Sequence, residues 1–198
     1  MRGWYRFLIG VGIIGIFCFS EGITQERRDM KALMVIAPEG FRDEELFQPK
    51  QILEEAGVDV VVASTTLSSA KGMLGGSIVP DIKIDDVEVN DFDAIIFVGG
   101  VGASCYWDDS LAHKIIMEAN SLNKVVAAIC IAPVTLANSG ILKGKKATVW
   151  PSEADSLKSK GAIYTGNPVE REGNIITASG PTVAKEFGKE IVQALFKK

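Results

Sequence analysis

The stretch "VVAAICIAPVTLA", residues 125–137, decides the fold, because it reads as a buried strand that runs directly into a helix. Its first residues form the continuous apolar run typical of a strand that is covered on both faces. Pro133 suits the first turn of a helix, where a backbone N–H has no helical partner. The stretch therefore predicts a strand, a tight turn at Cys130 and a short helix.

The same alternation of apolar strands and helical patterns continues along the chain from residue 31. It predicts an α/β fold with a mostly parallel central sheet covered by helices on both faces. We expect strands at 31–37, 58–64, 93–100, 125–130 and 146–150, a hairpin or edge segment at 75–87, two strands around Glu172-Gly173 within 163–179, and helices at 44–57, 110–123, 132–140, 152–161 and 182–196.

Three features fall at the carboxyl ends of these expected strands. They are the loop 38–44, the glycine pair Gly99-Gly100, and Cys130. Ligands of open parallel sheets gather at this edge. The coincidence predicts a functional site there.

The turn at Cys130 has the pattern of a nucleophile elbow, in which a reactive side chain sits between a strand and a helix. Ala128 and Ala132 are small residues at the spacing that lets the two elements come close. The start of a helix favours a thiolate, so we expect a lowered pKa for Cys130. Amides of the Gly99-Gly100 loop would face an anionic oxygen. The alternative is a free cysteine that only fills the core.

The segment "PEGFRDEEL" places several carboxylates just after the first strand. One interpretation is structural, with Asp43 as the N-cap of a helix whose first turn is acidic. Pro49 cannot donate a helical hydrogen bond to the carbonyl of Glu45, so we expect a distorted turn there. In the other interpretation Glu45 faces the sheet edge. Desolvation would then keep it protonated and let it share a proton with the thiolate.

The first 29 residues differ from the rest. Arg2 and Arg6 precede "FLIGVGIIGIFCFS", an apolar run at 7–20 that is short for a membrane-spanning helix. The pattern predicts a signal peptide or membrane anchor with a linker over 1–29, and a domain over 30–198. Export or anchoring is therefore expected. The alternatives are a helix of the domain, or a start at Met30, which would make the protein cytoplasmic.

Charge and cysteine content exclude several classes of partner and site. The net charge of −4 is spread without a basic stripe, so no nucleic-acid partner is expected. Cys18, Cys105 and Cys130 are too few for a disulfide framework, and His113 is the only histidine. No metal site is expected.

Four segments together resemble the ThiJ/PfpI family: "VVAAICIAPVTLANSGILKGKKAT", "FRDEELFQP", "DAIIFVGG" and "GNIITASGP". The similarity extends over residues 31–198. It implies a flavodoxin-like three-layer sandwich, similar to class I glutamine amidotransferases, and a homodimer or larger homo-oligomer. It also implies that Cys130 is the elbow cysteine, that Glu45 is its paired glutamate, and that amides at Gly100 and Ile131 hold the oxyanion.

The chain also departs from the family. Peptidase-like members have a histidine after the elbow cysteine, where this chain has Ile131, and deglycase-like members have a histidine near Trp150. His113 is expected at the surface. A cysteine–histidine dyad is therefore not expected, whereas a mechanism built on Cys130 and Glu45 remains.

The preferred expectation is a glyoxalase- or deglycase-type enzyme that acts on small reactive carbonyl compounds without a cofactor. The alternatives are a PfpI-like cysteine peptidase and a non-enzymatic redox-sensing or stress-protective protein. Cys105 is expected either as an ordinary loop residue or as a resolving thiol beside Cys130. Trp150 is expected either to wall the pocket or to pack at a dimer contact.

Overall fold

A seven-stranded sheet forms the centre of the computed structural model, which describes residues 30–196. All neighbouring strands are parallel except β11, which runs antiparallel to β12. The expected α/β fold with a mostly parallel sheet is confirmed. In the order β11-β12-β8-β7-β1-β3-β6, the strands span Val169–Glu172, Ile175–Ala178, Val125–Ile129, Ala94–Phe97, Lys31–Val35, Asp59–Ser64 and Ile82–Lys83.

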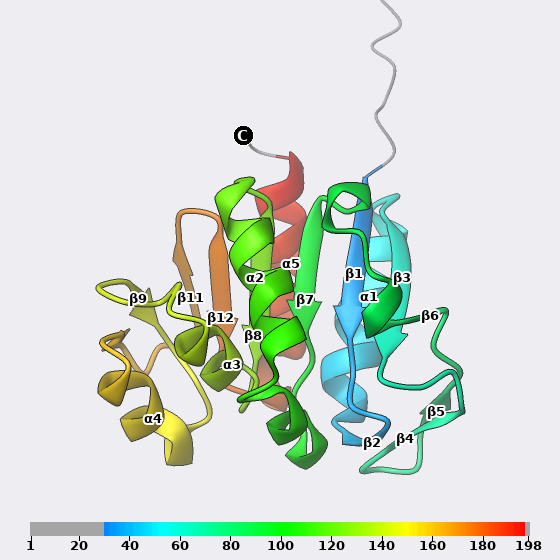
Figure 1. Cartoon of the computed structure of the whole chain (residues 1–198), viewed down its shortest axis with the longest axis horizontal. Coiled ribbons are helices and arrows are strands. Elements are labelled where there is room, and N and C mark those ends of the chain that lie inside the picture. The colour runs from blue at the N-terminus through cyan, green and yellow to red at the C-terminus, as the bar shows by residue number, and fades with distance from the viewer. Residues whose placement is uncertain (1–29, 197–198) are drawn as a thin grey trace, which may run out of the picture.

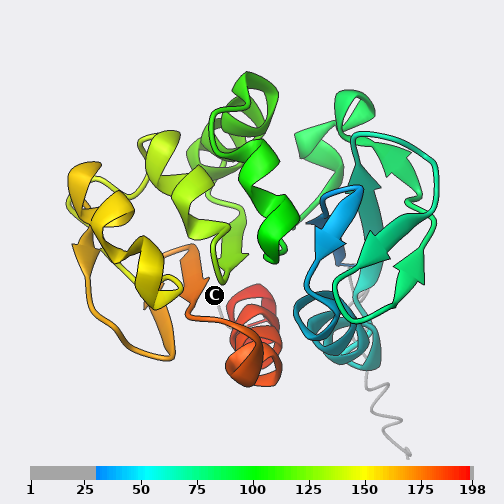
Figure 2. The same cartoon turned by 90° about the horizontal axis from the view of Figure 1, so that it is seen from below.

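Helices cover both faces of this sheet. α1 (Asp43–Glu55) and α5 (Ala184–Phe196) pack together on one face. α2 (Ser110–Ser121) and α3 (Pro133–Asn138) cover the other, and α4 (Ala154–Ser159) packs against α3. Figure 2 shows the strands between these two helical layers.

Strand β1 shows why the central strands are apolar throughout. Leu33 and Val35 point into the core beneath α2 and α3, whereas Ala32 and Met34 point into the core beneath α1 and α5. All four side chains are fully buried. A strand with a helical layer on each side has no solvent face, so its sequence does not alternate.

Helix α1 continues through Pro49 as one element. The helix is closely packed there: a Cβ added to Gly188 of α5 would lie 2.9 Å from the Cα of Pro49. The sequence suggested Asp43 as the N-cap of this helix. That prediction is wrong, because Arg42 occupies the N-cap position. The Asp43 carboxylate instead accepts hydrogen bonds from the backbone amides of Leu74 (2.8 Å) and Gly76 (2.7 Å). It thereby joins the start of α1 to a distant turn.

Short strands form two further sheets that the sequence did not indicate. β2 (Glu39–Phe41), β4 (Ala70–Gly72) and β5 (Ser77–Ile78) form one, and β9 (Lys146–Ala147) pairs with β10 (Ile163–Tyr164) in the other. The segment expected as a hairpin or edge segment at 75–87 is not a hairpin, because β5 pairs with β4 while β6 joins the central sheet beside β3. The edge alternative is confirmed, because β6 is the border strand of that sheet. Strands of two or three residues are too short to give a periodic pattern. The described residues also contain short 3₁₀ segments: η1 (Ile84–Asp86), η2 (Val89–Asp91), η3 (Val101–Tyr106), η4 (Pro151–Glu153) and η5 (Pro181–Val183).

The carboxyl ends of the parallel strands gather at one edge of the molecule. Strands β1, β3 and β7 point to the lower edge in Figure 1, where β2, β4 and β5 also lie. The expected signal peptide or anchor falls in residues 1–29, outside the described residues. Within residues 30–196 no helix is both long and apolar enough to cross a membrane.

Candidate active site

Cys130 lies at the sharp turn between β8 and α3. Its φ angle of 64° is in the left-handed region, which non-glycine residues rarely adopt. Such strain persists only where neighbouring contacts hold the backbone in place. The strand, turn and helix predicted from this stretch are confirmed.

Three hydrogen bonds to other segments of the chain hold this turn. The Cys130 amide donates to the carbonyl of Ala178 in β12 (2.9 Å), and the Cys130 carbonyl accepts from the amide of Trp150 (2.8 Å). The indole Nε1 of Trp107 donates to the carbonyl of Ile131 (3.2 Å). Bonds from three separate segments therefore fix the peptide groups on both sides of the thiol.

Glu45 is fully buried beside this thiol, on the first turn of α1. Neither carboxyl oxygen has a well-formed hydrogen bond within the described residues. Gly99 separates the two side chains: an added Cβ would lie 2.4 Å from Oε2 of Glu45 and 2.5 Å from Cβ of Cys130. Glycine at this position is therefore what allows the carboxyl and the thiol to approach each other.

Burial disfavours charge on both groups. Desolvation raises the pKa of Glu45 to about 8. The hydrogen bond with Cys130 and the positive charge of Arg42 lower this pKa, but by less. Desolvation, followed by the charge of Glu45, raises the pKa of Cys130 to about 12. The lowered thiol pKa expected from the sequence is therefore not what this environment produces. α3 is only six residues long, and its start does not offset the loss of water.

Two backbone amides oppose this shift. The N–H groups of Gly100 and Ile131 lie close to the sulfur of Cys130 and lower the pKa of its thiol. Gly100 adopts φ 97°, and an added Cβ would lie 2.4 Å from the backbone nitrogen of Arg42. The amide of Arg42 donates to the carbonyl of Gly99 (3.0 Å). The glycine loop is thus fixed to the start of α1 with its amide turned toward the thiol.

These groups form the floor of a pocket of about 210 Å³. Two side chains from short connecting segments, Met73 and Val101, form part of its rim, and the sequence analysis did not identify them. The only hint in the sequence is an apolar pair, Met73-Leu74, set between glycines. The full lining consists of Arg42, Glu45, Met73, Gly100, Val101, Cys130, Ile131, Trp150 and Pro181.

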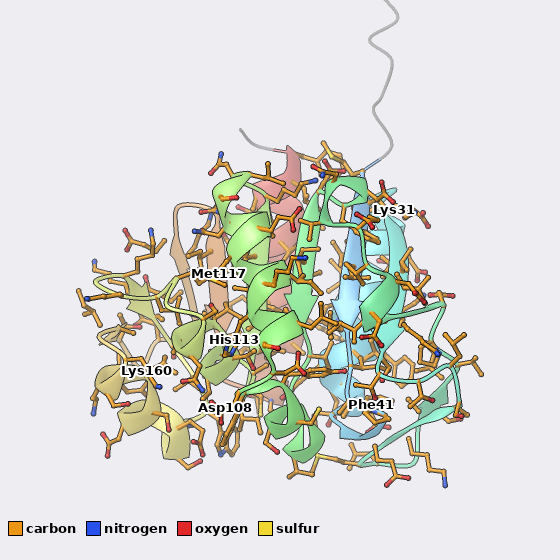
Figure 3. The ribbon with its side chains drawn as sticks, in the orientation of Figure 1. Lys31, Phe41, Asp108, His113, Met117 and Lys160 are labelled. Carbon is orange, nitrogen blue, oxygen red and sulfur yellow. The ribbon has the colours of Figure 1, made fainter. Side chains whose placement is uncertain are left out.

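Cys105 and His113 are not among the residues that line this pocket. Cys105 is exposed in η3. His113 lies on α2 (Figure 3), half-buried, where its Nε2 makes a 2.8 Å hydrogen bond to the carbonyl of Trp107. No group of three or more His, Cys, Asp and Glu side chains suited to a metal ion occurs within residues 30–196.

Comparison with known proteins shows the family of this chain. The model of the DJ-1/PfpI family matches residues 30–194. An uncharacterized protein of Methanocaldococcus jannaschii is 45% identical over 96% of this chain and 95% of its own length. A Pyrococcus horikoshii protein named deglycase is 31% identical over 84% of this chain and 99% of its own length. A Caenorhabditis elegans protein named glutathione-independent glyoxalase is 29% identical over 83% of this chain and 88% of its own length.

A solved structure has the same fold. The ThiJ/PfpI domain protein of Brachyspira murdochii superimposes with a TM-score of 0.82 at 34% identity, over 84% of this chain and 97% of its own. The flavodoxin-like arrangement expected from the sequence is thereby confirmed.

The relatives overturn the predicted location. They are DJ-1/PfpI-type proteins of archaea and eukaryotes, and the Pyrococcus deglycase is matched over 99% of its length. None of them bears the name of an exported or membrane-anchored protein. The prediction of export or anchoring through residues 1–29 is wrong. A basic start followed by an apolar run was not specific enough to carry it.

Proposed function

This chain belongs to the DJ-1/PfpI family, and from that premise we propose that it converts small 2-oxoaldehydes to hydroxy acids through Cys130 and Glu45. The observation that carries the proposal is a strained cysteine beside a fully buried, protonatable glutamate at the floor of an open pocket. The relatives named deglycase and glyoxalase support the same class of chemistry.

The first step is addition of the Cys130 sulfur to the aldehyde carbon while the thiol proton passes to the Glu45 carboxylate, because burial raises the pKa of the thiol to about 12. A C–S bond forms, and the carbonyl π electrons move to oxygen, which the amides of Gly100 and Ile131 stabilise. Glu45 in its acid form donates the proton that completes a hemithioacetal. A raised pKa suits Glu45 to this role, because a more basic carboxylate is better able to accept the thiol proton and pass it to the oxyanion.

The second step moves a proton within the substrate. The Glu45 carboxylate removes the proton from the former aldehyde carbon and passes it to the neighbouring carbonyl oxygen, so that an enediol forms. Glu45 then moves the proton of the hydroxyl on the sulfur-bearing carbon to the neighbouring carbon, which gives a thioester. Water hydrolyses the thioester to a 2-hydroxy acid and free thiol. No external oxidant or reductant is needed, because one carbon is oxidised as its neighbour is reduced.

Turnover of methylglyoxal tests the proposal. We expect lactate to form with wild-type protein and to be abolished in Cys130→Ser. No turnover, or turnover unchanged in Cys130→Ser, would defeat it.

Alkylation of Cys130 as a function of pH tests how the proton is shared. Because the charge of Glu45 raises the pKa of the thiol, Glu45→Gln should shift the rise of Cys130 alkylation to lower pH. An alkylation profile unchanged in Glu45→Gln would show that the carboxyl group and the thiol do not share a proton, and it would contradict the mechanism.

The peptidase alternative lacks a suitable base. The position after the elbow cysteine is Ile131, and His113 does not line the pocket. Failure to cleave an unfolded protein substrate would exclude it.

The redox-sensing alternative predicts peroxide-dependent mass gain at Cys130 or a bridge to Cys105. The expected homodimer also stays a prediction, which sedimentation of the purified protein would test.

A further inference from the structure

Three large apolar side chains around the pocket are exposed and do not belong to the buried core. Met73 is 42% exposed, Trp150 43% and Val101 65%, although they come from three distant segments. Single exposed apolar residues are ordinary, but these three line the same pocket. Their convergence points to an apolar ligand group.

Trp150 is fixed in position. Its backbone N–H is bonded to the carbonyl of Cys130 (2.8 Å). Its indole lies directly over Gly180, where an added Cβ would come within 2.7 Å of the ring. The chain therefore presents a rigid aromatic surface next to the thiol, and little conformational entropy is lost when a ligand packs against it.

The charges near the pocket are already compensated. Nε and Nη2 of Arg42 donate to the two carboxylate oxygens of Glu44, at 2.8 and 3.1 Å. Glu45 is buried in the floor against Cys130. The remaining side chains of the lining are Met73, Val101, Ile131, Trp150 and Pro181, all apolar.

The pocket is larger than the smallest 2-oxoaldehydes need. Its volume of about 210 Å³ corresponds to roughly seven water molecules at about 30 Å³ each. Glyoxal bound at Cys130 would leave apolar walls in contact with water. A bulky apolar substituent would displace that water.

We propose that Trp150, together with Met73 and Val101, forms a subsite that selects 2-oxoaldehydes carrying an aromatic or bulky apolar substituent. The inference rests on the proposed function, because it places the aldehyde carbon at Cys130. Trp150 is then a specificity-determining residue. It packs against the substituent while its backbone holds the elbow.

Kinetic comparison of two substrates tests this subsite. We expect wild-type kcat/KM to be about tenfold higher for phenylglyoxal than for methylglyoxal. Trp150→Ala should reduce that ratio to near one, whereas Trp150→Phe should keep most of it. Met117→Ala is the matched control, since Met117 is 48% exposed on α2 (Figure 3) and does not line the pocket. An equal ratio in wild type and Trp150→Ala would overturn the proposal.

Binding without turnover separates this proposal from the proposed function. In Cys130→Ser we expect acetophenone to bind at least tenfold more tightly than acetone, with a shift of the Trp150 indole N–H resonance. Adding Trp150→Ala should remove the difference. If the double variant still discriminates, or neither ketone binds, the subsite is refuted even where methylglyoxal is turned over. Trp150-dependent acetophenone binding in a protein that turns over no 2-oxoaldehyde supports the subsite and refutes only the proposed function.

Discussion

The segments that follow β7 and β8 make an instructive comparison, because both leave adjacent strands at the same edge and both contain a cysteine. After β8 the chain turns immediately, and Cys130 takes the strained conformation at the pocket floor. After β7 the chain passes through Gly99-Gly100 into η3, and Cys105 follows only near the end of that segment, exposed and outside the pocket lining. The position of the turn, rather than the presence of a thiol, distinguishes the two.

Replacing each cysteine by serine tests the difference between the two segments most directly. We expect Cys130→Ser to lower methylglyoxal turnover by at least about 10³-fold, because the nucleophile is lost. Cys105→Ser should change turnover by less than about twofold. Initial rates of lactate formation measure both, and comparable losses in the two variants would show that the segments act together.

The glycine loop after β7 should give the next largest effect. In Gly99→Ala the new methyl group would meet both Glu45 and Cys130, so we expect a loss of about 1–3 kcal/mol in the free energy of unfolding and a large loss of turnover. Gly57→Ala is the control: it has φ 83° but no atom within 4 Å of the added Cβ. It should lose stability through backbone strain and retain its turnover. An active Gly99→Ala protein would mean that the carboxyl and the thiol do not need this close approach.

The buried carboxyl predicts a pH-dependent stability. The pKa of Glu45 is raised from 4.5 to about 8 in the folded chain, so its stabilising contribution is full below pH 4.5 and is lost as the pH rises to about 8. Glu45→Gln does not lose stability in this way, because its amide does not ionise. Between pH 4.5 and 8.5 we expect the unfolding free energy of Glu45→Gln to rise relative to that of wild type by about 3–5 kcal/mol. Urea unfolding across that range measures the gain, with exposed Glu88→Gln as a control that should run parallel to wild type.

The smallest expected effect concerns the indole that holds the elbow. Trp107→Phe removes the hydrogen bond from Nε1 to the carbonyl of Ile131 and should cost about 1 kcal/mol of unfolding free energy. It should also raise the rate of Cys130 alkylation, because the turn becomes less constrained. Met117→Ala, on α2 and outside the pocket lining, should leave alkylation unchanged. Equal alkylation rates in wild type and Trp107→Phe would show that the other two bonds suffice.

Long apolar strands and amphipathic helices were predictable from the sequence because each carries enough residues to show a period. The pairing of β6 with β3 was not, since two residues show none and the partner is chosen by tertiary contacts. The placement of Cys130 and Gly99-Gly100 at one edge followed from strand direction. The pocket rim did not, because Met73 and Val101 reach it through a loop and a 3₁₀ turn whose paths depend on bonds such as those of Asp43.

The two borders of the central sheet limit how copies of this chain could join. On one border β6 is only two residues long and follows Pro80; on the other, β11 is the charged sequence Val-Glu-Arg-Glu. Short strands and charged strands are poor templates for extending a sheet from one molecule into the next. We therefore expect any self-association to use helical or loop surfaces rather than a sheet shared between two copies.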